Sequence, residues 1–361
     1  MIVTISIFLV CLLILAGTLL YYSPGKPQPF VDESGNPLTG SISEKRYVEI
    51  NGVTQGMFIK GKDKTNPVLL YLHGGLPEYF LTEKYPVGFE DFFVVCWWEQ
   101  RGSGLSFSSD VAKETITLKQ LLADTKEVTN YLRKRFGKEK IYLMGHSGGT
   151  FIGIQAAAKH PELYHAYIGV AQMSDQLRSE QLAYEFMLDQ FKNKGNSRMV
   201  RKLEATPVNL NTGTPDEYLA IRDEAMHSLG VGTTHAMKSV ISGIFLESLK
   251  KRDYTWSEKF RLWHGKATSG VSSLWKSMIP TDLAKEVPTL DIPVYFLHGK
   301  YDYTVSYPLA KDYLEKLQAP VKGFYTFEKS AHSPMFEEPD KVQHILLEDV
   351  LIGENNLADK K

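Results

Sequence analysis

One serine of this chain stands in the setting that an activated serine nucleophile requires. Small residues surround it in the run Gly145-His146-Ser147-Gly148-Gly149. The apolar run Ile141–Met144 before it predicts a buried strand, and residues 150–160 after it predict an alanine-rich helix. Strand, G-x-S-x-G and helix together indicate a nucleophile elbow, in which the serine is strained and lies at a helix N-terminus that favours developing negative charge. The alternative is an ordinary N-cap serine.

Two more candidates follow predicted strands. Asp302 comes a few residues after the strand 293–297, and His332 lies in the loop after the strand 322–327. Active residues of such sheets gather at the carboxyl ends of strands, so both are expected beside Ser147. His332 would take the serine proton and later deliver it to the leaving group, while Asp302 would orient the imidazole. The alternatives are a turn aspartate and a surface histidine.

Three other histidines compete for the role of base. His298 precedes Asp302 at a strand end, His146 fills the variable position of the elbow, and His73 ends an early strand. We interpret all three as packed or hydrogen-bonding side chains.

An oxyanion hole needs two preorganised N–H donors. Gly148, directly after the nucleophile, is expected to supply one of them. The other is expected from the loop that follows the early strand, with Gly75 as the donor and Leu76 as the open alternative. A plain glycine turn would also explain this loop.

Composition narrows the class of protein. The chain has 361 residues, 43% of them hydrophobic, and a formal net charge of −1. These values suit one large α/β domain, or a core domain with a smaller insertion, and they argue against a nucleic-acid partner. The two cysteines, Cys11 and Cys96, predict neither a disulfide nor a metal site. No metal or organic cofactor is implied.

The N-terminus predicts a membrane anchor. Residues 2–20 carry no charge, and a bilayer of about 30 Å is spanned by about 20 apolar residues. Tyr21 and Tyr22 suit the interface between membrane and water. We interpret residues 1–22 as an uncleaved single-pass anchor whose orientation stays open, because only Lys26 lies in the near flank. A cleaved signal peptide is the alternative, although a basic n-region and a clear cleavage site are missing.

The rest of the chain divides into four segments. Residues 23–42, rich in Pro and Gly, predict a linker. Residues 43–173 alternate strands with helices, and residues 286–361 resume that pattern. Between them, residues 174–285 predict a helical cap, with amphipathic helices over 180–191, 215–229 and 234–249. The fold class is therefore α/β, a mostly parallel doubly wound sheet with an inserted helical cap and an N-terminal transmembrane helix.

With these motifs, residues 46–351 resemble the α/β-hydrolase superfamily, in which Ser, Asp and His follow this chain order. The sequence is most similar to the proline iminopeptidase branch, which has the motifs His-Gly-Gly-Pro-Gly, Asp-Gln-Arg-Gly-x-Gly-x-Ser and Gly-x-Ser-x-Gly-Gly. The second motif stands here as Glu99-Gln100-Arg101-Gly102-Ser103-Gly104-Leu105-Ser106, with Glu for Asp. The first departs, because His73-Gly74-Gly75 runs into Leu76-Pro77-Glu78.

The resemblance implies a serine peptidase that releases an N-terminal residue, often proline, and binds its free amine with acidic side chains. Glu78 is then a candidate substrate-binding residue. Further candidates lie on the cap helices, where solvated helix faces are the alternative: Glu180, Glu185, Glu217 and Glu224. We therefore predict a membrane-anchored serine hydrolase that forms an acyl-enzyme, with a carboxylesterase or lipase on apolar acyl substrates, or a non-catalytic hydrolase-fold receptor, as alternatives.

Overall fold

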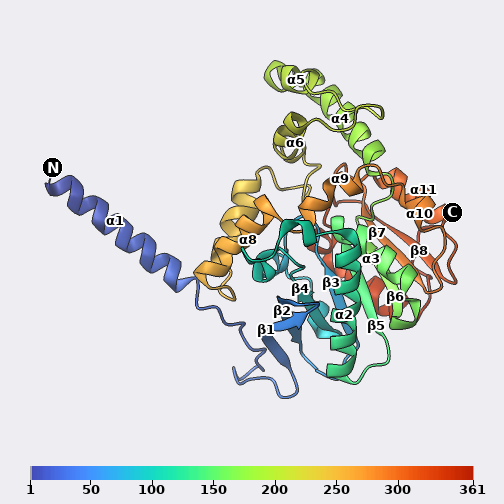
Figure 1. Cartoon of the computed structure of the whole chain (residues 1–361), viewed down its shortest axis with the longest axis horizontal. Helices are drawn as coiled ribbons and strands as arrows, with labels where there is room; N and C mark the ends of the chain where they lie inside the picture. Colours follow the sequence, from blue (N-terminus) through green and yellow to red (C-terminus); the bar gives the residue numbers. More distant parts are fainter. Residues whose placement is uncertain (1, 361) are drawn as a thin grey trace.

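A computed structural model describes residues 2–360. Within them, the centre of the molecule is an eight-stranded sheet in the order β1-β2-β4-β3-β5-β6-β7-β8 (Figure 1). Its strands are β1 Ile42–Ile50, β2 Val53–Gly61, β3 Val68–Leu72, β4 Val94–Trp98, β5 Ile141–His146, β6 Tyr164–Val170, β7 Val294–Gly299 and β8 Lys322–Phe327. Strands β1, β2 and β4 pair antiparallel, and the pairs from β4 to β8 are parallel. The predicted mostly parallel sheet is confirmed.

The central strands are apolar throughout because helices cover both faces of the sheet. Every residue of β3 and β4 is buried. Alternate residues serve opposite faces: Leu70 packs in one core cluster, and its neighbours Leu69 and Tyr71 pack in the other. The first cluster includes side chains of α2 Leu118–Phe136, α3 Gly148–Lys159 and α11 Tyr307–Lys316. The second includes α12 Pro334–Glu337, α13 Pro339–Ile345 and the π-helix η8 Leu346–Val350.

Local signals account for several element ends. Asn51 and Gly52 form a hairpin turn, with φ of 48° and 77°, as a two-residue turn between twisted strands requires. Helix α2 begins after Thr117, because the Thr117 side chain accepts a hydrogen bond from the N–H of Gln120. Short 3₁₀ helices occupy the loops: η1 Tyr79–Glu83, η2 Phe89–Asp91, η3 Gly104–Ser106, η4 Lys113–Thr115 and η5 Pro161–Leu163.

A helical block lies between β6 and β7. It comprises α4 Gln176–Asn193, α5 Ser197–Glu204, α6 Asp216–Leu229, the π-helix η6 Ile241–Phe245, α7 Leu246–Lys250, α8 Trp256–Thr268, η7 Val271–Leu274, α9 Trp275–Met278 and α10 Leu283–Glu286. Helices α4, α5 and α6 stand above the core in Figure 1. We refer to this block as the cap; its exact boundaries, 174–285, stay a prediction.

One predicted cap helix is wrong in its start. The pattern predicted a helix from Thr234, but helical structure begins only at Ile241. The N–H of His235 donates to Glu337 of the core, and its ring contacts the carbonyl of Gly230. These tertiary contacts hold the segment out of a helix. Helix α5 is an additional helix that the sequence did not predict.

The N-terminal helix, α1 Ile2–Tyr21, projects away from the body of the protein (Figure 1). It is long and apolar enough to cross a membrane, and a signal sequence near an N-terminus would meet the same criteria. The chain after it runs beside the cap, where Pro24 forms a β-bridge with Thr255.

Candidate active site

The turn between β5 and α3 presents Ser147 at the carboxyl end of the sheet. Ser147 has φ of 54° and ψ of −126°, a strained conformation for a residue with a side chain. The flanking glycines are required sterically. A Cβ on Gly149 would lie 2.1 Å from the carbonyl oxygen of Leu72, and one on Gly145 would lie 2.7 Å from the carbonyl oxygen of Gly149. The elbow geometry predicted from the sequence is therefore present.

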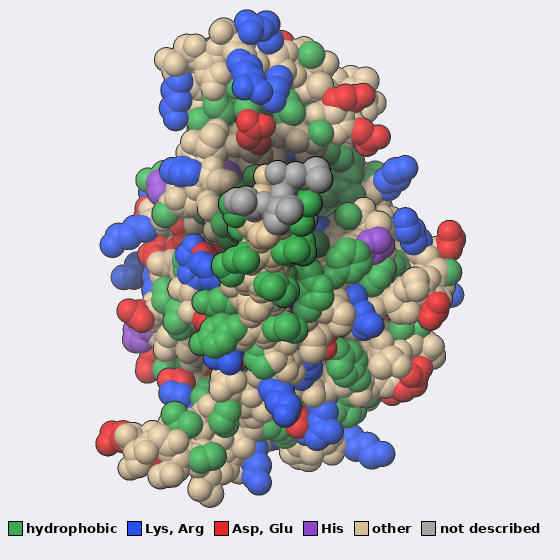
Figure 2. Space-filling model, turned by 90° about the vertical axis from the view of Figure 1, so that its left-hand side faces the viewer, with side chains coloured by type: hydrophobic (Ala, Val, Ile, Leu, Met, Phe, Trp, Pro, Cys, Tyr) green, Lys and Arg blue, Asp and Glu red, His purple; other side chains and the backbone are tan. Residues whose placement is uncertain are grey.

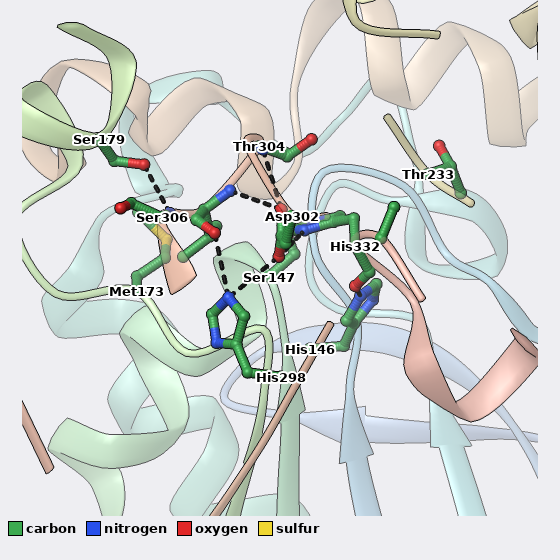
Figure 3. Close-up of polar contacts among 12 residues, drawn as sticks. His146, Ser147, Met173, Ser179, Thr233, His298, Asp302, Thr304, Ser306 and His332 are labelled. Carbon is green, nitrogen blue, oxygen red and sulfur yellow. Dashed lines mark hydrogen bonds and ion pairs between the residues drawn. The ribbon is translucent and has the colours of Figure 1, made fainter. Parts of the chain in front are cut away.

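Asp302 and His332 are brought together as predicted (Figure 3). The Nδ1 atom of His332 lies 2.9 Å from Oδ2 of Asp302. Nδ1 therefore carries the proton that the carboxylate accepts, which leaves Nε2 as the basic nitrogen. Burial lowers the pKa of His332, although Asp302 opposes this effect. A neutral imidazole at neutral pH is the form that a general base requires.

The carboxylate of Asp302 is fully engaged. Its Oδ1 accepts from the N–H groups of Thr304 and Val305, both at 2.9 Å, and its Oδ2 also lies 3.2 Å from Nε2 of His298. Burial would raise the pKa of Asp302, but the two histidines outweigh it and hold this pKa below its usual range. His298, interpreted from the sequence as structural, thus helps to orient the acid.

The glycine loop after β3 packs directly on Ser147. A Cβ on Gly74 would lie 2.8 Å from Cβ of Ser147, so only glycine permits this approach. Burial lowers the pKa of His73 to about 4, and its neutral ring accepts from the N–H of Gln100 at 3.0 Å while its Nδ1 contacts the carbonyl of Gly74 at 2.8 Å. The Gln100 side chain returns to the carbonyl of His73. Gln100 therefore supports the glycine loop after β3.

Glu99 and Arg101, which flank Gln100 in the motif of residues 99–106, make structural contacts. Glu99 accepts from the N–H of Leu105 and from the hydroxyl of Tyr254 in the cap. Burial raises the pKa of Glu99 to about 8. Arg101 forms a buried ion pair with Asp124 of α2, with 2.6 Å between Nε and Oδ2. The motif thus ties the core to the cap and to α2 rather than supplying reacting groups.

Glu78 and His146 form a second pair that the sequence did not predict. Oε1 of Glu78 lies 2.7 Å from Nδ1 of His146, and Nε2 of His146 lies 2.9 Å from the carbonyl oxygen of His332. Both partners only accept hydrogen bonds, so both ring nitrogens must carry protons. Burial alone would lower the pKa of His146, but Glu78 outweighs it and raises this pKa. Oε2 of Glu78 accepts from Tyr71.

The site opens into a cavity of about 420 Å³. Core residues at its floor are Gly75, Leu76, Glu78, Ser147, Gly148 and His332. Most of its wall is apolar and belongs to the cap, including Leu219, Met226, Val240, Ile244, Trp263 and Trp275. Both glycines proposed for the oxyanion hole therefore line the same cavity as Ser147.

The cap acids behave differently from one another. Glu180 is buried and paired at both oxygens with Arg222, at 2.6 and 2.7 Å, so it does not face substrate as a free charge. Asp223, which the sequence reasoning missed, lines the cavity with a side chain that is 58% exposed. No sequence signal separates Asp223 from the other acids of α6, because the direction it faces depends on how the cap sits on the core.

Known proteins share this architecture. Residues 67–339 match the family model described as the alpha/beta hydrolase fold. A probable aminopeptidase, YbaC, of Bacillus subtilis is 30% identical over 308 residues, which cover 84% of this chain and 95% of that protein. The proline iminopeptidase of Saccharolobus solfataricus is 22% identical over 338 residues, covering 88% and 95%.

A solved structure agrees at the level of the fold. The proline iminopeptidase of Mycobacterium smegmatis superposes with a TM-score of 0.59 at 12% identity, covering 84% of this chain and 97% of that one. The sheet order, the elbow and the family match together establish that this chain belongs to the α/β-hydrolase family.

Proposed function

We propose that this protein is a serine hydrolase that cleaves amide or ester bonds through an acyl-enzyme, with Ser147, His332 and Asp302 as its triad. One observation carries the proposal: the strained elbow serine and the Asp302-oriented histidine line the same cavity. A non-catalytic receptor would not need this arrangement, and the open cavity further disfavours it.

The chemistry follows from these positions. Nε2 of His332 takes the proton as Oγ of Ser147 attacks the substrate carbonyl carbon. Gly148 and Gly75 supply N–H groups to the oxyanion, and the N-terminus of α3 adds its dipole. The intermediate collapses as His332 returns the proton to the leaving group. Water, deprotonated by His332, then attacks the acyl-enzyme, and Ser147 leaves with the proton.

Within this class we favour an aminopeptidase-like activity that releases an N-terminal residue. The similarity to a probable aminopeptidase and to proline iminopeptidases supports it. Asp223 and Glu78 are the acidic side chains that line the cavity. Asp223 is the more accessible of the two and is our candidate for the substrate amine, because Glu78 is already paired with the protonated His146.

The nucleophile is tested by labelling the full chain with a fluorophosphonate probe. Wild type should be labelled and Ser147→Ala should not. Ser109→Ala, which changes an exposed serine outside the site, is the matched control and should label like wild type. A folded wild-type protein that resists the probe would refute the proposed enzyme and favour the receptor.

Substrate class is tested with proline and alanine amides, each with a free or an acetylated amine. Free-amine substrates should be hydrolysed and acetylated ones should not. Asp223→Asn should lower kcat/KM for the free-amine amides by roughly tenfold, the value of one charged hydrogen bond. Glu224→Gln, on the same helix but ion-paired with Lys202 outside the cavity, is the control.

A carboxylesterase acting on apolar acyl groups is the second candidate. The apolar cap wall favours it, since Val240, Ile244 and Trp263 would contact an acyl chain. Acyl esters of increasing chain length separate the candidates, because an esterase should prefer them to every free-amine amide. We also propose that residues 2–22 anchor the enzyme in a membrane, as the length and apolarity of α1 support.

A further inference from the structure

The exit of α1 is fixed to the cap at one place. Nζ of Lys259 donates to the carbonyl oxygens of Tyr22 and Leu249, both at 2.6 Å, and Lys259 is buried. The N–H of Gly25 donates to the carbonyl of Arg252, whose guanidinium lies over the ring of Tyr21. These contacts fix the chain after α1 to the cap. The α7–α8 region of the cap therefore lies next to the surface in which α1 is held.

That region carries an apolar patch. Five large side chains of η6, α7 and α8 are between 38% and 68% exposed: Ile241, Phe245, Leu246, Trp256 and Phe260. Figure 2 faces the side from which α1 projects; apolar side chains gather where α1 stands in front of the body and hides its own base, and Lys and Arg side chains lie around them. The bridge between Pro24 and Thr255 places Trp256 directly beside that base. The patch thus continues the apolar surface of α1 onto the body.

The charge of this segment suits an anionic surface. Residues 236–266 contain seven Lys or Arg and three Asp or Glu, although the whole chain has a formal net charge of −1. Lys251 and Lys259 are buried, which leaves five cations at least partly exposed. All three acids are paired with lysines: Glu247 with Lys250, Asp253 with Lys251, and Glu258 with Lys45 of β1. Apolar side chains within a basic border are the composition of surfaces that bind anionic lipid.

The same short helix forms both the patch and the wall of the active-site cavity. Val240 and Ile244 line the cavity, while their neighbours Ile241 and Phe245 are exposed. The ring of Phe245 meets the ring of Trp263, which lines the cavity, at 5.2 Å between centroids. One layer of side chains therefore separates the patch from the substrate site.

We propose that this patch lies on the lipid bilayer that holds α1, and that the cavity receives the apolar part of an amphiphilic substrate from that bilayer. The substrate class rests on the proposed hydrolase function, whereas the membrane contact does not. A second copy of this chain is the competing occupant of the patch.

The contact is tested by tryptophan quenching in the full chain, reconstituted in vesicles of phosphatidylcholine and phosphatidylglycerol with brominated acyl chains. Helix α1 contains no tryptophan, so the signal reports only the body of the protein. The bromines should quench wild type, and Trp256→Phe should lose most of that quenching. Trp275→Phe, in the cavity wall away from the patch, should retain it.

A tryptophan at a second position shows whether the whole patch lies on the bilayer or only the part of it beside α1. Phe245→Trp in the Trp256→Phe background should restore quenching. Absence of quenching at both positions would overturn the proposal. It would be overturned equally if Phe260→Ser changed the oligomeric state in detergent while lipid failed to quench, because a second copy would then cover the patch.

The substrate route is tested with two esters, a long-chain ester held in vesicles and a short water-soluble one. The triple variant Ile241→Ser/Phe245→Ser/Phe260→Ser should lower the ratio of their kcat/KM values at least about tenfold, because it removes apolar contact with lipid. The control, Leu347→Ser/Ile352→Ser/Leu357→Ser, changes exposed apolar residues near the C-terminus, far from α1 (Figure 1), and should keep the ratio within about twofold.

Failure of the proposed hydrolase function can be distinguished from failure of the proposed substrate route. A wild type that hydrolyses neither ester refutes the hydrolase function, and quenching still decides the membrane contact. An unchanged ratio in the triple variant, with both esters hydrolysed, refutes delivery of substrate from the bilayer.

Discussion

In the proposed mechanism, the ionisation of His332 decides the pH range in which Ser147 can be activated. Burial holds its pKa below the ordinary value of 6.5. A base must be neutral, so activity is present above this pKa and is lost as the pH falls through it. We expect kcat/KM for an uncharged ester to have an acid limb with its midpoint below pH 6.5. A pH–rate profile with a midpoint above that value would contradict the assignment.

A change at Asp302 provides a second test of the role of His332. Asp302→Asn accepts from His332 less well and permits the wrong tautomer, so kcat should fall by about 10⁴-fold with the fold retained. Circular dichroism of the variant separates lost chemistry from lost structure.

His146 is a positioning residue, since it contacts the carbonyl of His332 and not the reacting atoms. Its positive charge lowers the pKa of His332, while Glu78 raises it. His146→Gln removes the cation and leaves Glu78 without its partner. The acid limb of kcat/KM should therefore move to higher pH, and the free energy of unfolding should fall by about 3–5 kcal/mol, as for a broken buried pair.

A double-mutant cycle checks that assignment. The double variant His146→Gln/Glu78→Gln should lose less unfolding free energy than the sum of the two single variants. Each single variant leaves one buried charge without its partner, whereas the double variant leaves none. His344→Gln, at an exposed histidine, should move neither the acid limb nor the unfolding free energy. Additive single effects would argue that the two side chains do not interact.

At the scale of the element, the β5–α3 turn depends on the closeness of α3 to β3. Gly149→Ala would place its Cβ 2.1 Å from the carbonyl oxygen of Leu72, so α3 must move and Ser147 with it. We expect a loss of about 3 kcal/mol in unfolding free energy, measured by urea denaturation, together with a large loss of kcat.

Gly213→Ala is the control for that change. Gly213 has a left-handed backbone, with φ of 78°, and no atom lies within 4 Å of a Cβ added to it. It should cost about 1–2 kcal/mol of strain and leave kcat unchanged. Equal kcat in both variants would show that the elbow tolerates displacement.

At the scale of the whole molecule, a buried ion pair inside the cap also contacts the core. Arg222 of α6 binds Glu180 of α4, and its Nη2 also donates to the carbonyl of Thr304 beside Asp302. Arg222→Met leaves Glu180 buried and unpaired, so unfolding free energy should fall by about 3–5 kcal/mol. Urea denaturation should show recovery in Glu180→Leu/Arg222→Met, since that variant buries no charge.

An exposed pair between neighbouring cap helices provides the comparison. Lys202 of α5 lies 3.7 Å from Glu224 of α6, and both side chains are open to solvent. Lys202→Met should cost less than about 1 kcal/mol. If Glu180→Leu/Arg222→Met were as unstable as Arg222→Met alone, packing rather than charge would explain the loss.

The sequence by itself determined the features that depend on short stretches of chain. The apolar run Ile141–Met144 predicted a buried strand, and β5 begins at Ile141, because a strand buried on both faces needs continuous apolar side chains. The strand 322–327 was predicted to the residue. The elbow was predictable because its glycines are a steric requirement of the turn itself. Ser147, Asp302 and His332 each follow a predicted strand, and this placement predicted that the three side chains would meet at the carboxyl end of the sheet.

Only the tertiary structure decided which charges pair. Glu78 meets His146 across 68 positions of sequence, and Glu180 meets Arg222 across 42. The segment before Ile241 has helical periodicity, yet contacts from His235 to the core prevent a helix. The strength of an ion pair and the fate of a marginal helix depend on burial and on partners from remote segments. A local pattern contains neither, so the pairing of charges inside the cap and the face that the cap turns toward α1 were decided by the tertiary structure.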